Sequence, residues 1–453
     1  MGKHKIPENG IYDARTLGAG RMLLLGFQHM FAMFGATILV PILTGLDVSN
    51  TLLFAGLGTL LFHLITGGKV PAFLGSSFAF LGGYAAIAPL IDDSIPNTEL
   101  LPYACFGVAC AGLVYAVLAA LVRAFGAEKV MRFFPPIVTG PIIIAIGLNL
   151  SASAINNCSG NWWIAIAAIL IIVAANIWGR GMVKIIPILL GVVGSYLLAV
   201  IFDAGVRETL VKNVSEAALL ALPVKMDQTV FGLFVRGNVD RDMLLTAVIT
   251  IVPLSLATMV EHIGDVSAIS STCGRNYIQD PGLHRTLLGD GLATTLAALF
   301  GAPANTTYGE NTGVLALSRI YDPRVIRIAA VLAMCFSFSP KFAAIISSMP
   351  GGTIGGVSLV LYGMISAVGV RNVVENQVDF TKSRNVLIAA LILVLSIGIS
   401  YSKAGALTFG SVSLSGLAVG SLVGIVLNAV MPGKDYVFGQ NPQGDESVNF
   451  IIQ

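Results

Sequence analysis

Three acidic residues stand out because they fall inside otherwise apolar stretches of the chain. Glu261 and Asp265 lie four residues apart, so on a helix they share one face. Glu310 follows Gly309 at the start of a short apolar segment. A carboxylate at the centre of a membrane helix costs about 2.5–3.5 kcal/mol on insertion scales, and such residues mark ligand, ion or proton sites. The three side chains therefore indicate a binding site or a proton site within a membrane.

The same residues also have structural explanations. Each carboxylate could accept hydrogen bonds from Ser, Thr or backbone groups of neighbouring helices, and this alternative carries most weight for Asp265. His262 faces another side of the helix and is expected to pack or to hydrogen-bond between helices. The order Glu-His-Ile-Gly-Asp is not the HExxH motif of zinc proteases. Because no metal motif and no nucleophile–base pair stands out, we expect neither an enzyme nor a bound cofactor.

Composition defines the elements that must position these residues. The chain has 453 residues, of which 55% are hydrophobic and 11% charged, whereas soluble domains have about 25% charged residues. Apolar runs near 20 residues recur along the chain, as in proteins with several transmembrane helices. We therefore predict a multi-pass protein of the cell membrane. The net charge of +2 does not favour a nucleic-acid partner.

The apolar pattern predicts fourteen transmembrane spans. Lys and Arg gather in alternate short connections, which places both termini in the cytoplasm. Two spans are short and lie at corresponding places in the two halves of the chain. Seven spans per half would make the second half enter the membrane from the opposite side, as an inverted repeat. The predicted spans are 22–44, 51–66, 75–90, 101–122, 137–155, 162–178, 182–202, 243–266, 286–300, 305–318, 325–348, 354–370, 384–401 and 411–431.

The two short spans suggest what the site binds. Non-helical backbone at membrane depth must be buried in protein or line a cavity, and the first amides of a half-helix there present N–H donors. Phe78 in the first short span adds a flat surface for stacking. Carboxylate acceptors, amide donors and an aromatic face together suit a planar, neutral, amide-like ring. An anion would favour Arg or Lys, and the core of neither half supplies one except for Lys341.

Several motifs together resemble the nucleobase–ascorbate transporter family, in particular its bacterial uracil:proton symporters. The resemblance extends from about Gln28 to Val430. It is carried by GSSFAF (75–80), EHIGD (261–265), DPGLHR (280–285) and NTTYGEN (305–311).

The resemblance implies an all-α polytopic fold of fourteen transmembrane segments in two inverted seven-span repeats. The third and tenth spans are broken and pair through two short antiparallel strands. It also implies a homodimer, with each chain divided into a core and a gate domain. The expected boundaries are 1–133 (core, spans 1–4), 134–242 (gate, spans 5–7 and an outer loop), 243–349 (core, spans 8–11), 350–433 (gate, spans 12–14) and 434–453 (cytoplasmic tail).

In the family, the glutamates that match Glu261 and Glu310 bind the base, and the backbone at Phe78 and Gly309 contacts it. Proton coupling is expected from Glu261, Asp265 and Glu310, with the co-transported proton taking the place of a cofactor. Tyr308 and Tyr362 could bond a ligand or another helix. The substrate-binding candidates are Glu261, Glu310, Phe78, Gly309, Ala36, Tyr308, Tyr362 and Ser77.

Two positions disagree about the substrate. Aspartate at Asp265 occurs in many purine-transporting relatives, whereas Glu310 matches uracil symporters rather than the Gln of those relatives. We give Glu310 more weight, because it would touch the ligand. The resulting hypothesis is uracil import by proton symport with alternating access. The alternatives are a purine symporter (xanthine, guanine or hypoxanthine) of the same family, and an anion transporter or channel with the same architecture.

Overall fold

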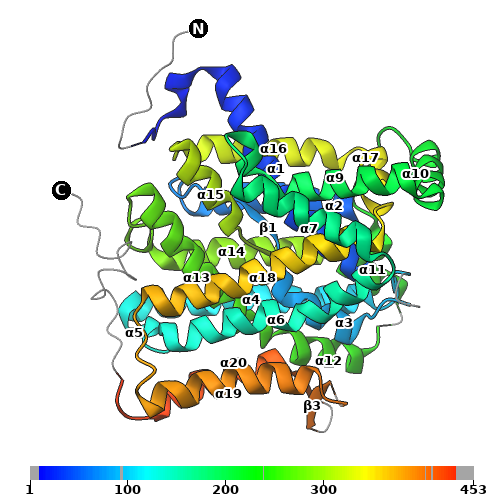
Figure 1. Cartoon of the computed structure of the whole chain (residues 1–453). Helices are drawn as coiled ribbons and strands as arrows, with labels where there is room; N and C mark the ends of the chain where they lie inside the picture. The colour runs from blue at the N-terminus through cyan, green and yellow to red at the C-terminus, as the bar shows by residue number, and fades with distance from the viewer. Residues whose placement is uncertain (1–9, 92–94, 238, 404, 410–411, 435–453) are drawn as a thin grey trace.

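The computed structural model describes residues 10–91, 95–237, 239–403, 405–409 and 412–434, and it is predominantly helical (Figure 1). The predicted tail 434–453 lies outside these residues except for Lys434. The helices are α1 (Ala19–Thr44), α2 (Val48–Ile65), α3 (Leu81–Ile87), α4 (Leu101–Phe125), α5 (Ala127–Met131), α6 (Pro136–Ser159), α7 (Trp162–Ile177), α8 (Met182–Ile185), α9 (Pro187–Phe202), α10 (Ala204–Glu216), α11 (Val230–Arg236), α12 (Arg241–Ile251), α13 (Leu254–Cys273), α14 (Leu283–Leu299), α15 (Gly309–Ser318), α16 (Pro323–Ser337), α17 (Pro340–Ser347), α18 (Gly351–Glu375), α19 (Ser383–Ser400) and α20 (Gly416–Val430).

Many of these helices have the length and composition of membrane spans. Within the described chain, seven are long and apolar enough to cross a bilayer, or up to nine if each of two bent pairs is one span. Shorter apolar helices cover Phe78–Ile87, Trp162–Ile177 and Gly416–Val430. A mostly helical protein with several membrane spans is thus confirmed, while the count of fourteen stays a prediction.

Two pairs of consecutive helices are bent against each other, and the sequence explains both bends. The predicted span 325–348 is wrong as a single helix: α16 and α17 meet at 87°. Ser339 is extended (φ −106°, ψ 97°) because Pro340 disfavours helical backbone in the residue before it. α9 and α10 meet at 108°. There Asp203 ends one helix and caps the next, accepting hydrogen bonds from the Gly205 and Val206 amides.

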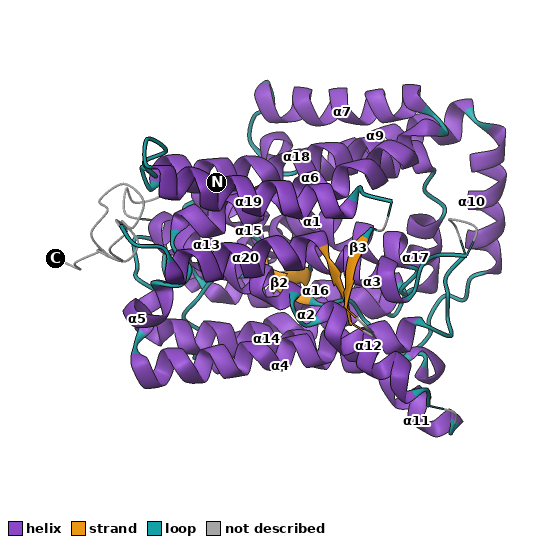
Figure 2. Cartoon of the chain, turned by 90° about the horizontal axis from the view of Figure 1, so that it is seen from below, coloured by secondary structure: helices purple, strands orange, loops and turns teal. Residues whose placement is uncertain are grey.

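A two-stranded antiparallel sheet joins the two broken segments. Strand β1 (Leu74–Ser76) pairs with β2 (Asn305–Thr307), with Gly75 opposite Thr306, and all six residues are buried. Figure 2 shows β2 enclosed by helices. A Cβ atom at Gly75 would lie 2.5 Å from the Tyr308 ring, so glycine is required there. The 3-10 helix η2 (Phe78–Phe80) and α3 follow β1, and α15 follows β2. Because the strands are antiparallel, the two short helical segments leave the sheet at opposite ends, and η2 and α15 both pack against α13.

A second strand pair lies outside the predicted fold. Strand β3 (Ala406–Phe409) pairs antiparallel with β4 (Val412–Ser415) and forms a hairpin before α20. The predicted span 411–431 therefore begins too early, since its helix starts at Gly416. Apolar residues alternate with Thr and Ser in this stretch, a pattern with the period of a strand. The span was predicted from apolar composition, which does not distinguish this strand pattern from a helix.

The most extensive helix contacts divide into two sets. In one set, α2 packs against α14 and α16, α4 against α14 and α12, and α1 against α16. In the other, α18 packs against α6 and α7, α19 against α20 and α6, and α7 against α9. α13 contacts members of both sets, including α15, α14, α6 and α20. The helix that carries Glu261 and Asp265 thus lies where the two sets meet.

Candidate functional site

The candidate site lies along α13, against which the segments that follow β1 and β2 both pack. Hydrogen bonds from Ser77 N to Ala304 O (2.8 Å) and from Tyr308 N to Phe73 O (3.0 Å) extend the sheet beyond the paired strands. The helical turns begin directly afterwards, at Phe78 and Gly309. The first amides of a helix have no partner within the helix and carry its positive dipole end. Each of the two ends of the sheet therefore leads into a helix start that is rich in N–H donors.

Asp265 reaches this place from α13. A methyl group added at Gly309 would lie 3.2 Å from Asp265 Oδ1, so the carboxylate lies against the first residue of α15. Asp265 and Glu261 are both half-buried on the same helix. A carboxylate at a helix start is stabilised by the helix dipole. The structure thus brings together two of the predicted site residues, Asp265 and Gly309.

Glu310 is placed by its backbone alone. It is the second residue of α15, immediately after Gly309, and its side chain lies outside the described part of the structure. α13 and α15 pack against each other. The two glutamates therefore lie on neighbouring helices, and the prediction that their side chains face a shared space stays a prediction.

The aromatic pair connects the two sets of helices. The rings of Phe78 and Tyr362 are 5.7 Å apart between centroids and meet edge to face at 78°. Phe78 follows β1, while Tyr362 belongs to α18 in the other set. Both are buried, at 7% and 1% exposure. Ser77, the residue before Phe78, is also buried, and its hydroxyl has no hydrogen-bond partner among the described residues. A buried hydroxyl of this kind is available to a ligand or a water molecule.

Tyr308 holds the strands to α1. Its hydroxyl donates to Ser76 O at 2.8 Å and lies 3.3 Å from the Thr37 hydroxyl. Ser76 Oγ in turn donates to Thr37 O at 2.8 Å. Ala36 is fully buried beside Thr37 on α1. These bonds favour the interhelical alternative for Tyr308, and its contact with a ligand stays a prediction.

Sequence reasoning missed a buried histidine–aspartate pair. His262 Nδ1 lies 2.9 Å from Thr307 Oγ1 and 3.3 Å from Asp290 Oδ2 of α14. His262 and Asp290 are fully buried. The pair links α13 and α14 to β2, which confirms an interhelical role for His262. The available signal was an acidic residue inside the predicted span 286–300, since such residues mark functional sites by default.

Asn311 is a second residue that sequence reasoning did not single out. Its Nδ2 donates to His29 O at 3.1 Å and lies 3.2 Å from His29 Nδ1. Asn311 Oδ1 is buried without a hydrogen-bond partner among the described residues. α1 and α15 are therefore joined two residues after Gly309. The polar run Gly-Glu-Asn-Thr at the start of an apolar segment was the signal that could have indicated it.

The described residues contain no group of three or more His, Cys, Asp or Glu side chains placed to hold a metal ion. What the arrangement offers is a set of carboxylates, helix-start amides, a free hydroxyl and two aromatic rings. This combination suits recognition of a small planar molecule with both donors and acceptors.

Comparison with known proteins identifies relatives over most of the chain. The uracil permease of Bacillus caldolyticus is 40% identical over 442 residues, covering 94% of this chain and 95% of that protein. The uracil permease of Bacillus subtilis (strain 168) is 39% identical over 420 residues, covering 89% and 91%.

Two solved structures share the fold. The transmembrane domain of the cyanobacterial bicarbonate transporter BicA matches with a TM-score of 0.56, covering 93% of this chain and 99% of that one. SLC26A9 matches with a TM-score of 0.60, covering 95% and 70%. Both are 14% identical in sequence, so the likeness concerns the fold alone.

The sequence model described as the permease family matches residues 20–405. Membership of such a family indicates a transporter rather than an enzyme. It agrees with the apolar helices and with the motifs that resemble nucleobase–ascorbate transporters. The chain therefore belongs to this permease family and is a multi-pass membrane transporter.

Proposed function

We propose that the protein imports uracil together with a proton. The observation that carries the proposal is the β1–β2 pair, which leads into two short helical segments that both pack against α13, where Asp265 meets Gly309. The names of the relatives, uracil permeases at 39–40% identity, support a pyrimidine base as substrate. The same arrangement suits the planar ring that the sequence indicated.

Recognition of uracil would use both the hydrogen-bond acceptors and the hydrogen-bond donors of the site. Glu261 and Glu310 accept hydrogen bonds from the two ring N–H groups, and helix-start amides at Phe78 and Gly309 donate to the ring carbonyls. Hydrogen bonds to a charged acceptor are roughly twice as strong as neutral ones, which favours a ring with N–H donors. Phe78 and Tyr362 cover the ring from either side of the interface. Ser77 offers one further hydroxyl.

Uracil is neutral near pH 7, so membrane voltage alone cannot concentrate it, and coupling to a proton supplies a driving force. A carboxylate held in a low-dielectric site takes up and releases a proton when its surroundings change. Asp265, against the start of α15, is placed to hold that proton, and Glu261 lies one turn away on the same face.

We propose that alternating access uses the two sets of helices. We assign 1–133 and 243–349 to the core domain and 134–242 and 350–433 to the gate domain, as two inverted seven-span repeats. The packing of α2, α4, α14 and α16 together, and of α6, α7, α18 and α19 together, supports this division. Relative movement of the domains would open the site to each side in turn. We further propose a homodimer with both termini in the cytoplasm.

The alternative substrate is a purine base, because many purine-transporting relatives have aspartate at the position of Asp265. An anion, such as those that proteins of the same fold carry, would be repelled by the acidic pair on α13. Uptake of labelled bases by the purified protein in sealed vesicles separates these possibilities. We expect uracil to accumulate only when a pH gradient, acidic outside, is imposed, and unlabelled xanthine or guanine not to compete. Accumulation of uracil that does not depend on the pH gradient would refute proton symport. Stronger competition by an unlabelled purine than by unlabelled uracil would refute uracil as the preferred substrate.

A further inference from the structure

We propose that residues 10–17 form a clasp that positions the two helices of the site, acting from their far ends. The clasp bonds to the ends of both α13 and α15. Along these helices, Cys273 lies roughly 18 Å from Glu261 and Ser318 roughly 14 Å from Gly309, at 1.5 Å per residue. None of its residues can touch a ligand at the site, so the proposed role is positioning.

The clasp holds the end of α15 through its backbone. Ile11 N donates to Arg319 O and Tyr321 N donates to Ile11 O, both at 2.8 Å, which makes Ile11 a parallel bridge partner of Ile320. Arg319 is the residue that ends α15, in a left-handed conformation (φ 54°). Gly10 also has positive φ (78°), and a Cβ atom there would lie 2.3 Å from the Tyr321 ring. The segment therefore lies in close contact with the turn that follows α15.

Tyr12 holds the end of α13. Its hydroxyl donates to the carbonyl of Cys273, the last residue of that helix, at 2.5 Å. The Arg275 guanidinium lies 4.0 Å above the centre of the Tyr12 ring, within the range of a cation–π contact. A second neighbour of the Tyr12 ring is Tyr321, at 5.4 Å between ring centroids. One side chain thus contacts both the end of α13 and the turn after α15.

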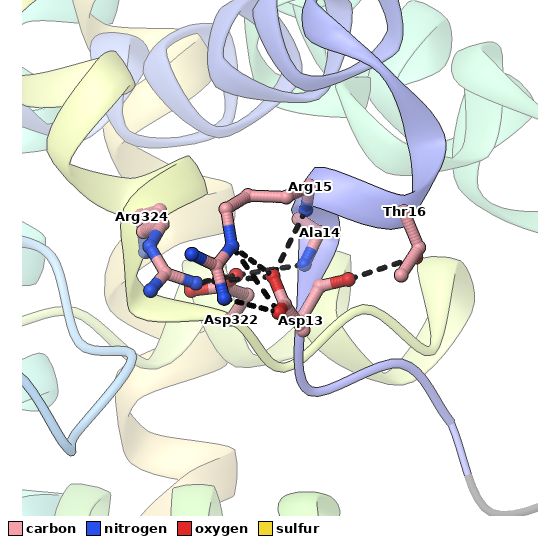
Figure 3. A network of polar contacts seen from close by, with 6 residues as sticks. All are labelled: Asp13, Ala14, Arg15, Thr16, Asp322 and Arg324. Atoms are coloured by element: carbon pink, nitrogen blue, oxygen red, sulfur yellow. Dashed lines mark hydrogen bonds and ion pairs between the residues drawn. The ribbon is translucent and has the colours of Figure 1, made fainter.

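Asp322 anchors the rest of the clasp. Figure 3 shows its carboxylate receiving the Ala14 amide, at 2.7 Å, and lying beside Arg324. Asp322 also caps α16 by accepting from Arg324 N at 2.9 Å, and its side chain is only 3% exposed. Arg324 Nη1 lies 3.1 Å from both Asp322 and Asp13. A buried carboxylate with a charged partner and two backbone donors is a strong local anchor.

An apolar cluster also contributes to this contact. It consists of the buried residues Ala14, Leu25, Ile320 and Val325, with Ile11, Leu17 and Met22 packed against them. The start of α1 is thereby joined to the same turn. Because the clasp, α13, α15 and α16 meet here, a shift of α15 relative to α13 requires several of these bonds to break. The separation of Gly309 and Asp265 at the site depends on that alignment.

The test compares two tyrosine variants, each of which loses one hydrogen bond from a tyrosine hydroxyl to a backbone carbonyl. In Tyr12→Phe the hydroxyl bonded to Cys273 O is removed. The matched control is Tyr401→Phe, since Tyr401 donates to Asn149 O, also at 2.5 Å, between α19 and α6. One hydrogen bond of ordinary strength is a factor of about five in an equilibrium. We expect Tyr12→Phe to raise the Kd for uracil by up to about fivefold, because the binding-competent alignment is less populated. The control should leave Kd within about twofold of the unmodified protein.

The affinity readout rests on the proposed function, so a second readout that needs no substrate accompanies it. Hydrogen exchange of the backbone amides of α15 should be faster in Tyr12→Phe and in Asp322→Asn than in Tyr401→Phe. Unchanged exchange in α15 for both clasp variants would overturn the clasp, whatever is transported. Faster exchange without any uracil binding by the unmodified protein would instead refute the proposed substrate and leave the clasp standing.

Discussion

Replacing Tyr308 with phenylalanine should destabilise the protein without removing a ligand contact. The ring stays over Gly75, but the donor to Ser76 O and the partner of Thr37 Oγ1 are lost. A net hydrogen bond contributes about 1 kcal/mol in soluble proteins and about 0.6 kcal/mol on average between membrane helices. Since Tyr308 is only 3% exposed, water cannot replace the hydroxyl. Two bonds, together with the unsatisfied Ser76 carbonyl, give a loss of about 2 kcal/mol.

The assay is equilibrium unfolding of Tyr308→Phe in detergent, beside the Kd for uracil of the folded fraction. The control is again Tyr401→Phe, whose hydroxyl lies at an exposed position and should contribute less. Wild-type stability of Tyr308→Phe, combined with a Kd raised more than about tenfold, would show that the hydroxyl binds the ligand. That result would refute the assignment of Tyr308 to the strand contacts.

Four further outcomes are expected. Glu261→Gln and Glu310→Gln should each abolish proton-driven uracil uptake in vesicles while membrane insertion stays normal, and normal uptake by both would remove the proposed site. Asp290→Asn should lower the unfolding midpoint, because the buried partner of His262 is weakened; an unchanged midpoint would show that the pair is not structural. Phe78→Leu should weaken uracil binding about tenfold or less, from the roughly 0.5–1.5 kcal/mol of an aromatic contact, and unchanged Kd would exclude stacking there. The hydrogen bond from Arg15, together with nearby Arg324, lowers the pKa of Asp13 to about 2. Its contribution to stability is therefore fully present above about pH 4 and is lost as pH falls through about 2. Because Asp13 does not titrate between pH 5 and 8, Asp13→Asn should leave the shape of the pH dependence of uptake in that range unchanged, whatever it does to the rate, and a changed shape would contradict this.

Local sequence patterns predicted the class of protein and much of the site. Runs of apolar residues predict membrane helices because the bilayer core accepts little else. The glycine-interrupted segments before Phe78 and Glu310 predicted breaks, and the structure has strands and short helices there. The bend at Ser339 also has a local cause, because Pro340 restricts the residue before it, although the span was predicted as one helix. These features depend on neighbours within a few positions, which the sequence displays directly.

By itself, the sequence determined that this chain is a polytopic membrane protein of a permease family, with acidic residues placed inside its spans. Only the tertiary structure decided which of those residues meet. β1 and β2 are more than 200 residues apart, and so are the clasp and the helix ends that it holds. The pairing of His262 with Asp290, and the position of Asp265 against Gly309, likewise depend on how α13, α14 and α15 pack. Helix periodicity states which face of a helix is polar, but the partner of that face is set by long-range packing, which no local pattern contains.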